Sequence, residues 1–177
     1  MIVPVRGEAP TLTIDNATES MNSTAAMEYS CDNGMYWAAC MDDMSLSELT
    51  GTTLLMRYAC DGTNPASNSV SVMVPTRNTT PHVAIDSYAE LLTATGTHPE
   101  YLAENLWTAI PSYGLNISDM AGQELTVRES YDNEHFASLS MLVKVPEKEV
   151  ISDLDATKPF LLNRETHVSY ITGRTKT

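Results

Sequence analysis

Alternation of apolar and polar residues is the feature that most restricts how this chain can fold. In TLLMRYAC (53–60) every second residue from Leu54 onward is apolar, and VSVMVP (70–75) repeats the pattern with valines. A period of two residues predicts β-strands with one face turned toward a core. The intervening DGTNPASNS (61–69) consists of turn-forming residues, so the two runs are predicted to form a hairpin. ELTVRES (124–130) and HFASLSMLVKV (135–145) predict a second one.

A further hairpin is predicted in YSCDNGMYWAACMDDM (29–44), because Asn33-Gly34 is the dipeptide most favoured in a two-residue type I′ turn. The predicted cross-strand pairs are Cys31 with Tyr36, Tyr29 with Ala38, and Met27 with Cys40. This register separates Cys31 from Cys40 by roughly 13–14 Å along the strands, too far for a disulfide or a shared zinc ion. Both cysteines are therefore expected to be free thiols in the core. A helix in this stretch is the alternative.

The middle of the chain carries signals typical of helices. In IDSYAELLTATG (85–96), Asp86 or Ser87 can act as an N-cap and Gly96 as a stop. THPEYLAENLWTAI (97–110) has capping-box spacing at its start, Pro99 in the first turn, and an apolar residue at every fourth position from Leu102. We therefore predict one or two helices over about 86–110. The fold class expected is α+β, with a mostly antiparallel β-sheet or barrel-like core built from hairpins.

The expected organisation is a single domain with an arm at each end. Residues 1–24 contain Pro4 and Pro10 and are predicted to be an extended N-terminal arm. Residues 25–157 are predicted to be a single α+β domain, with a short helical turn near 44–51, and residues 158–177 a C-terminal strand or arm. No internal repeat is expected.

The charge balance restricts the partners. With 23 acidic against 10 basic residues, a net charge of −13 and a pI near 4.5, the surface is expected to repel nucleic acid. No apolar run is long enough for a membrane span, and the N-terminus does not resemble a signal peptide. Three cysteines, an odd number, fit a reducing compartment. The partners expected are copies of the chain itself and neighbouring structural proteins.

Few residues suggest catalytic or metal chemistry. Asp132, Glu134 and His135 could ligate a divalent cation, but they also lie where a hairpin must turn, and we interpret them as turn residues. Asp42 and Asp43 are interpreted as capping residues of the following turn. No nucleophile elbow, zinc-protease motif or phosphate-binding loop is present, so the expectation is no cofactor, no metal, no catalytic residue and no enzyme activity.

The function predicted from these observations is a structural or assembly subunit of a virus particle. The prediction is a bacteriophage tail-tube or capsid-associated protein that is made in the host cytoplasm and self-associates through its sheet edges and arms. It fits a sequence that is rich in predicted β-structure and has a low content of charged residues. One alternative is a secreted or surface glycosylated β-rich binding domain that uses the sequons at Asn16, Asn22, Asn78 and Asn116. Another is an enzyme whose carboxylate and histidine residues meet in a cryptic site.

Overall fold

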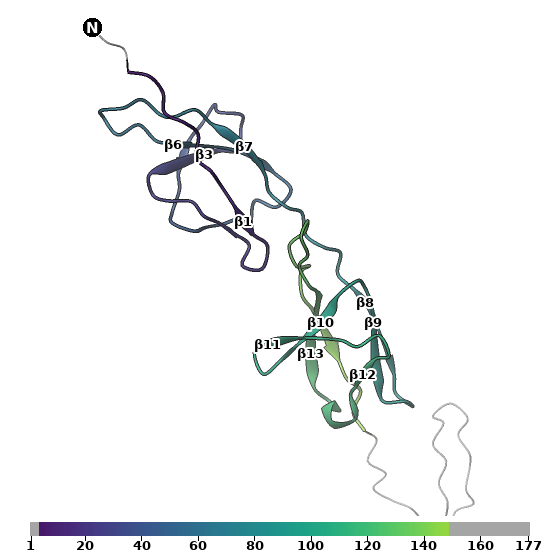
Figure 1. The fold of residues 1–177 in the computed structure, drawn as a ribbon. Helices are drawn as coiled ribbons and strands as arrows, with labels where there is room; N and C mark the ends of the chain where they lie inside the picture. The colour runs from purple at the N-terminus through teal and green to yellow at the C-terminus, as the bar shows by residue number, and fades with distance from the viewer. Residues whose placement is uncertain (1–3, 149–177) are drawn as a thin grey trace, which may run out of the picture.

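The computed structural model describes residues 4–148 and is nearly all β-structure (Figure 1). The strands of its first half are β1 (Ile14–Asp15), β2 (Ser20–Met21), β3 (Met27–Ser30), β4 (Ala38–Ala39), β5 (Met44–Ser45), β6 (Thr53–Tyr58) and β7 (Val70–Met73). Those of its second half are β8 (His82–Asp86), β9 (Leu91–Thr95), β10 (Pro99–Ala103), β11 (Leu106–Ala109), β12 (Leu115–Asn116), β13 (Glu124–Glu129) and β14 (Met141–Lys144). A single 3-10 turn, η1 (Ser118–Met120), is the helical element within this range.

The predicted helices at 86–110 are wrong, and with them the α+β class, because the region forms four strands. Asp86 does not cap a helix; its Oδ1 accepts hydrogen bonds from the backbone N–H groups of Tyr88 and Ala89 and closes the turn between β8 and β9. The same side-chain chemistry serves helix N-caps and β-turns, so the sequence signal did not distinguish them.

The second predicted helix, 97–110, is the hairpin β10–β11. Pro99 opens β10, a position where a strand tolerates proline, and Leu102 lies opposite Trp107. Glu104 and Asn105 form the turn, both at positive φ, at 48° and 67°. Four-residue spacing of leucines across a two-residue turn therefore imitated the periodicity of a helix.

Each half of the described chain is a β-sandwich of seven strands. In the first half, the sheet β1-β2-β5 packs against the sheet β4-β3-β6-β7, all pairs being antiparallel. In the second half, β12-β9-β8 packs against β11-β10-β13-β14. The fully buried side chains between the sheets include Met21 and Leu54 in the first core and Leu92 and Val127 in the second. Two sheets with interdigitated inner faces are the architecture shared by immunoglobulin-like sandwiches.

The two halves are repeats of one unit at a spacing of 71 residues, so the expectation of no internal repeat is wrong. We call residues 4–74 the first unit and residues 75–145 the second unit. Identical residues at this spacing include Pro4 and Pro75, Arg6 and Arg77, Ile14 and Ile85, Asp15 and Asp86, Glu19 and Glu90, Gly51 and Gly122, Leu54 and Leu125, Arg57 and Arg128, Asp61 and Asp132, Ser67 and Ser138, and Val74 and Val145. Every strand of the first unit has its counterpart in the second, in the same sheet order.

Backbone hydrogen bonds repeat at the same spacing. The N–H of Leu46 donates to the carbonyl of Glu19, and that of Ile117 donates to the carbonyl of Glu90. The N–H of Gly51 donates to the carbonyl of Val74, as that of Gly122 does to the carbonyl of Val145, at 3.1 Å in both cases. The repeat is therefore one of structure as well as of sequence.

The hairpin predicted around Asn33-Gly34 is confirmed for two of its three predicted pairs, whereas Cys31 and Tyr36 lie outside the strands. Tyr29 pairs with Ala38, and the N–H of Cys40 donates to the carbonyl of Met27. Asn33 and Gly34 both have positive φ, at 60° and 87°. The predicted hairpins β6–β7 and β13–β14 are confirmed as well.

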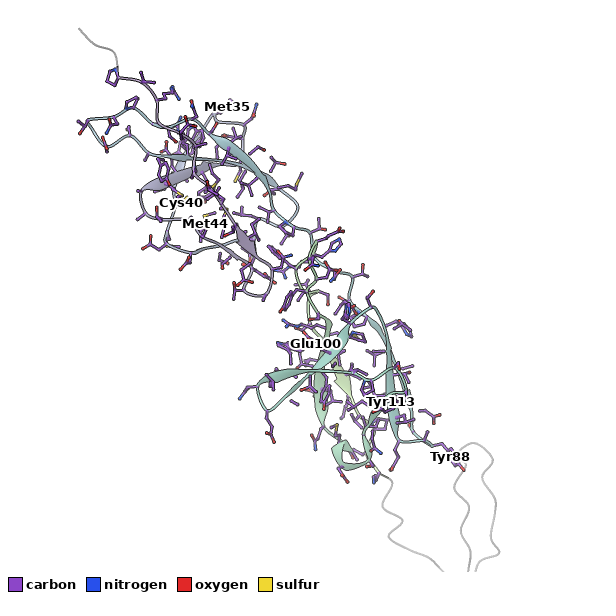
Figure 2. All side chains as sticks on the ribbon, viewed as in Figure 1. Met35, Cys40, Met44, Tyr88, Glu100 and Tyr113 are labelled. Atoms are coloured by element: carbon purple, nitrogen blue, oxygen red, sulfur yellow. The ribbon has the colours of Figure 1, made fainter. Side chains whose placement is uncertain are left out.

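The cysteines divide differently from the prediction. Cys40 is buried in the first core, and burial raises the pKa of its thiol. Cys31 is exposed, so its predicted place in the core is wrong, because the chain leaves the strand at Ser30. Figure 2 shows Cys40 and Met44 within the first unit and Met35 at its surface.

The segments expected to be arms have different outcomes. Within residues 1–24, β1 and β2 form a hairpin whose second strand pairs with β5. Residues 158–177, predicted to be a C-terminal strand or arm, lie outside the described residues. No helix in residues 4–148 has the length and apolar character needed to cross a membrane.

Candidate functional site

A glutamate, an arginine and a tryptophan meet on the outer face of the first unit. Glu28 and Arg57 are directly opposed on β3 and β6, with Arg57 Nε 2.6 Å from Glu28 Oε1. The guanidinium of Arg57 also lies over the ring of Trp37, 3.7 Å from its centroid. The three side chains join β3, β6 and the segment leading into β4 by one ion pair and one cation–π contact.

The same three residues recur in the second unit. Arg128 Nε lies 2.6 Å from Glu100 Oε1, and its guanidinium lies 3.8 Å from the centroid of the Trp107 ring. The residues between the glutamate and the tryptophan number two more in the first unit, where the loop before β4 is longer. Because both arginines are already engaged on one side by carboxylate and on another by indole, we interpret these triads as surface clamps of the four-stranded sheets.

Arg77 links the second unit to the first by a charged contact. Its Nη1 and Nη2 donate to the two carboxylate oxygens of Glu19 at 2.5 and 2.6 Å. The same guanidinium donates to the carbonyls of Ala137 (3.1 Å) and Ser47 (3.3 Å). Hydrogen bonding to Glu19 raises the pKa of Arg77, and parallel bonds of this kind fix geometry as well as charge.

Phe136 links the two units by an apolar contact. It lies in the segment between β13 and β14 of the second unit, is 0 % exposed, and belongs to the hydrophobic core of the first unit. Its N–H donates to the carbonyl of Thr76 and its carbonyl accepts from the N–H of Asn78, so it pairs with Arg77 in a parallel bridge. Figure 1 shows this segment and the one after β7 running together between the two units.

Two side-chain amides bind the segment after β13, and one of them reaches it from the first unit. Nδ2 of Asn16, in the β1–β2 turn, donates to the carbonyl of Asp132 at 2.8 Å. Nδ2 of Asn78 donates to the carbonyl of Ser130 at 2.7 Å. The junction is therefore held by an ion pair, a buried aromatic ring and the amide hydrogen bond of Asn16, whereas the Asn78 bond lies within the second unit. Two of the four predicted sequons thus use their amide nitrogens in hydrogen bonds, and a glycan on either would remove one.

The predicted metal candidates Asp132, Glu134 and His135 are brought together, but as a turn. Asp132 Oδ1 accepts from the N–H groups of Glu134 and His135, both at 2.7 Å, and lies 3.1 Å from His135 Nδ1. These backbone donors lower the pKa of Asp132 to about 2. Asp61, at the same place in the first unit, accepts from Thr63 and Asn64, and its pKa is also about 2.

The described residues hold no group of three or more metal-ligating side chains. Asp42 and Asp43 form no joint site either. Asp42 Oδ1 accepts from the N–H of Ala25, while Asp43 adopts a positive φ of 49°. Asp42 therefore secures the start of β3, rather than capping the turn that follows Asp43.

Glu129 differs from the other charged residues between 4 and 148 in being buried. Its carboxylate accepts a short hydrogen bond from the N–H of His98 through Oε1, while Oε2 has no hydrogen-bond partner among the described residues. It lies against Gly96, where a Cβ atom would overlap the carboxylate. The counterpart in the first unit is Tyr58, which is exposed.

Arg77, Glu19, Phe136 and the Glu–Arg–Trp triads were not singled out from the sequence. The signal that could have found them is the recurrence of V-P-x-R or V-P-x-K at residues 3–6, 74–77 and 145–148. Aligning the chain on these three segments brings both triads and both Asp-containing turns into correspondence.

Comparison with known proteins assigns no family. No protein-family model matches the chain, and no curated protein matches it. Among solved structures, the chain is similar to the crystal structure of the chicken CNTN1 FN1-FN3 domains, with 12% sequence identity and a TM-score of 0.27. That similarity covers 80% of this chain and 66% of the other.

Proposed function

We propose that this protein is a non-enzymatic structural module in which two β-sandwich units are locked end to end as a rigid spacer. The observation that carries the proposal is Phe136, a residue of the second unit that is fully buried in the core of the first. A flexible linker between independent domains leaves few contacts across the boundary, whereas this boundary contains a core residue.

The polar contacts support the same proposal. Arg77 donates two parallel hydrogen bonds to Glu19 and is only 22% exposed, so neither side chain is a freely moving surface charge. Asn16 of the first unit donates a hydrogen bond to the carbonyl of Asp132 in the second unit. Such contacts oppose both bending and twisting at the junction, which is what a spacer of fixed length requires.

The residues considered for metal binding or catalysis support a structural role rather than a catalytic one. Asp132 and Asp61 occupy equivalent turns and bind backbone N–H groups there, while Arg57 and Arg128 are held in equivalent clamps. Repetition of these groups in both units follows from duplication of a folding unit. A catalytic set would be expected to gather in one place.

The proposal does not extend to a virus particle. Neither the tandem sandwich architecture nor the comparisons support the predicted virion, capsid or tail subunit. A glycosylated surface domain is favoured by the exposure of Asn22 and Asn116, but the engaged amides of Asn16 and Asn78 argue against glycans there.

Small-angle X-ray scattering tests the spacer. The expected profile is that of a single elongated particle whose maximum dimension and cross-section fit the two units in their joined arrangement. Replacing both Arg77 and Phe136 with alanine should broaden the distance distribution, whereas the exposed pair Lys144→Ala and Leu139→Ala should leave it unchanged. A wild-type profile that requires an ensemble of bent and extended forms would contradict the proposal.

A further inference from the structure

The turn between β3 and β4 contains the dipeptide Asn33-Gly34. Asn33 is exposed, and the two residues have positive φ, at 60° and 87°. The corresponding turn of the second unit, between β10 and β11, has Glu104 and Asn105, also at positive φ, but the residue after Asn105 is a leucine. The first unit therefore combines an exposed turn asparagine with a glycine directly after it.

An asparagine followed by glycine can react with its own backbone. The amide nitrogen of the glycine, after losing its proton to hydroxide, bonds to the side-chain carbonyl carbon, and the side-chain nitrogen takes a proton from water and leaves as ammonia. Water then opens the five-membered imide at either carbonyl, which gives aspartate or isoaspartate. One water is consumed and one ammonia is released, with no oxidation or reduction. Glycine favours ring closure because it has no side chain to crowd the ring.

In the folded turn, the nitrogen that would attack is held as a hydrogen-bond donor. The N–H of Gly34 donates to Ser30 Oγ at 2.8 Å, and Ser30 is only 1% exposed. A backbone N–H bound to a buried acceptor loses its proton to solvent chiefly when the structure opens locally. Loss of that proton is also the first step of the reaction at Asn33, so the reaction requires the same opening.

Neighbouring side chains hold Ser30 and Gly34 in place. Ser30 Oγ donates to Asp32 Oδ1 at 2.7 Å, and the same oxygen accepts from the N–H of Tyr36 at 2.9 Å. The backbone N–H of Tyr36 and the hydroxyl of Ser30 lower the pKa of Asp32, so this acceptor is ionised at neutral pH. Trp37 Nε1 donates to the carbonyl of Gly34 at 3.1 Å. Opening of the turn therefore breaks several contacts at once.

We propose that Asn33 is a site of spontaneous deamidation whose rate is set by opening of the β3–β4 turn, and that Ser30 keeps this turn closed. Isoaspartate adds a methylene group to the main chain within the turn. The strand after the turn then no longer places Trp37 on Arg57, so the clamp of the first unit is lost. Repeated opening of the turn is thereby converted into a permanent chemical change.

Peptide mass spectrometry of the full 177-residue chain after incubation at mildly alkaline pH tests the proposal. The change to aspartate is followed by mass, and isoaspartate by its separate retention time. Wild-type protein in native buffer is expected to lose Asn33 at least about tenfold more slowly than the same protein unfolded in urea. Asn105 in the same digests is the internal control and should react far more slowly than Asn33 in urea, because the leucine after it crowds the ring.

Ser30→Ala removes the acceptor of the Gly34 N–H and should raise the rate at Asn33 about tenfold in native buffer. Asp32→Ala, at an exposed position, loosens the same network and should raise the rate as well. Hydrogen exchange of the Gly34 amide should accelerate in both variants. Asp86→Ala is the matched control, because it removes the same kind of N–H contacts from the β8–β9 turn and should leave Asn33 unchanged.

Three results would overturn the proposal. The first is a native wild type that loses Asn33 as fast as the chain in urea, since the turn would then give no protection. The second is an Asn33 that stays intact in urea. The third is an unchanged rate in both Ser30→Ala and Asp32→Ala; if Ser30→Ala does not fold, Asp32→Ala alone decides.

Discussion

Arg77 binds both carboxylate oxygens of Glu19 across the boundary between two repeats, and Lys148 lies on Glu90 in the corresponding place one repeat later. The side chains of Arg77 and Glu19 are 22% and 19% exposed, and those of Lys148 and Glu90 are 60% and 44% exposed. The same type of connector, V-P-x-R or V-P-x-K, therefore follows each of the two units.

Phe136→Ala should destabilise the first unit although the residue belongs to the second. Removing a fully buried phenylalanine costs about 3–5 kcal/mol through lost burial and the cavity that remains. Hydrogen exchange of core amides in β3 and β6 should accelerate accordingly. The control Leu139→Ala, in the same segment but 68% exposed, should change stability by less than about 0.5 kcal/mol. Equal effects of the two variants would show that Phe136 does not support the first core.

Arg57→Ala should cost about 1–2 kcal/mol of unfolding free energy, as the sum of a partly shielded ion pair with Glu28 and a cation–π contact with Trp37. Arg57→Lys should recover only part of the loss, since an ammonium cannot stack flat on the indole ring. Urea denaturation measures both, and Arg128→Ala and Arg128→Lys repeat the experiment in the second unit. Full recovery by lysine in both units would contradict the stacking role.

Gly96→Ala should be strongly destabilising because the new methyl group would overlap the carboxylate of Glu129. Thermal unfolding should show a loss in the range of about 1–3 kcal/mol typical of overpacked sites. Adding Glu129→Ala should relieve the overlap and recover part of the loss. Gly7→Ala is the control, since its nearest neighbour would be Ser67 Cβ at 3.9 Å and its φ is not in the left-handed range. If Gly96→Ala has the same unfolding free energy as the wild type, the carboxylate of Glu129 does not lie against Gly96.

Acid should destabilise the fold between about pH 4 and pH 2. The pKa of Asp61 and that of Asp132 are both about 2 rather than the ordinary 3.8, chiefly because backbone N–H groups of Asn64 and of Glu134 bind the ionised carboxylates. A depressed pKa means that the unfolded chain takes up protons first, so stability is full above pH 4 and falls as pH approaches 2.

The double variant Asp61→Asn, Asp132→Asn keeps acceptor oxygens in both turns and should flatten this dependence. Asp119→Asn, on η1, is the control for charge loss and should not. Stability measured by urea unfolding at stepped pH distinguishes the cases. A wild type equally stable at pH 4 and pH 2 would contradict the assignment.

The strands that could be predicted from sequence were those whose signal is local. The alternation in β6 and the Asn33-Gly34 turn each act over fewer than ten residues, and the register of Tyr29 with Ala38 followed from them. The prediction of helices at 86–110 was wrong because neither of its signals is specific to a helix. Asp86 can bind backbone N–H groups in a turn as well as at a helix N-cap, and leucines four residues apart also occur in a hairpin. Only pairing with distant strands, such as β10 with β13, decides between them.

The junction could not be predicted for a different reason. Arg77 and Glu19 are far apart in the chain, and although the recurring V-P-x-R or V-P-x-K segment marks Arg77, nothing next to Glu19 identifies it as the partner. Phe136 has no aromatic counterpart in the first unit, where Pro65 stands. The repeat was hidden because identities are scattered between positions that require only an apolar or turn residue, and because the loop before Trp37 is longer than that before Trp107.

Residual dipolar couplings of backbone N–H groups test the central claim most directly. In a weakly aligning medium, couplings from the strands of the first and second units should fit one common alignment tensor, in the orientation set by the Arg77–Glu19 and Phe136 contacts. Adding Arg77→Ala and Phe136→Ala should split the fit into two tensors of different magnitude. Two independent tensors already present without these two changes would contradict the account of a rigidly joined pair of repeats.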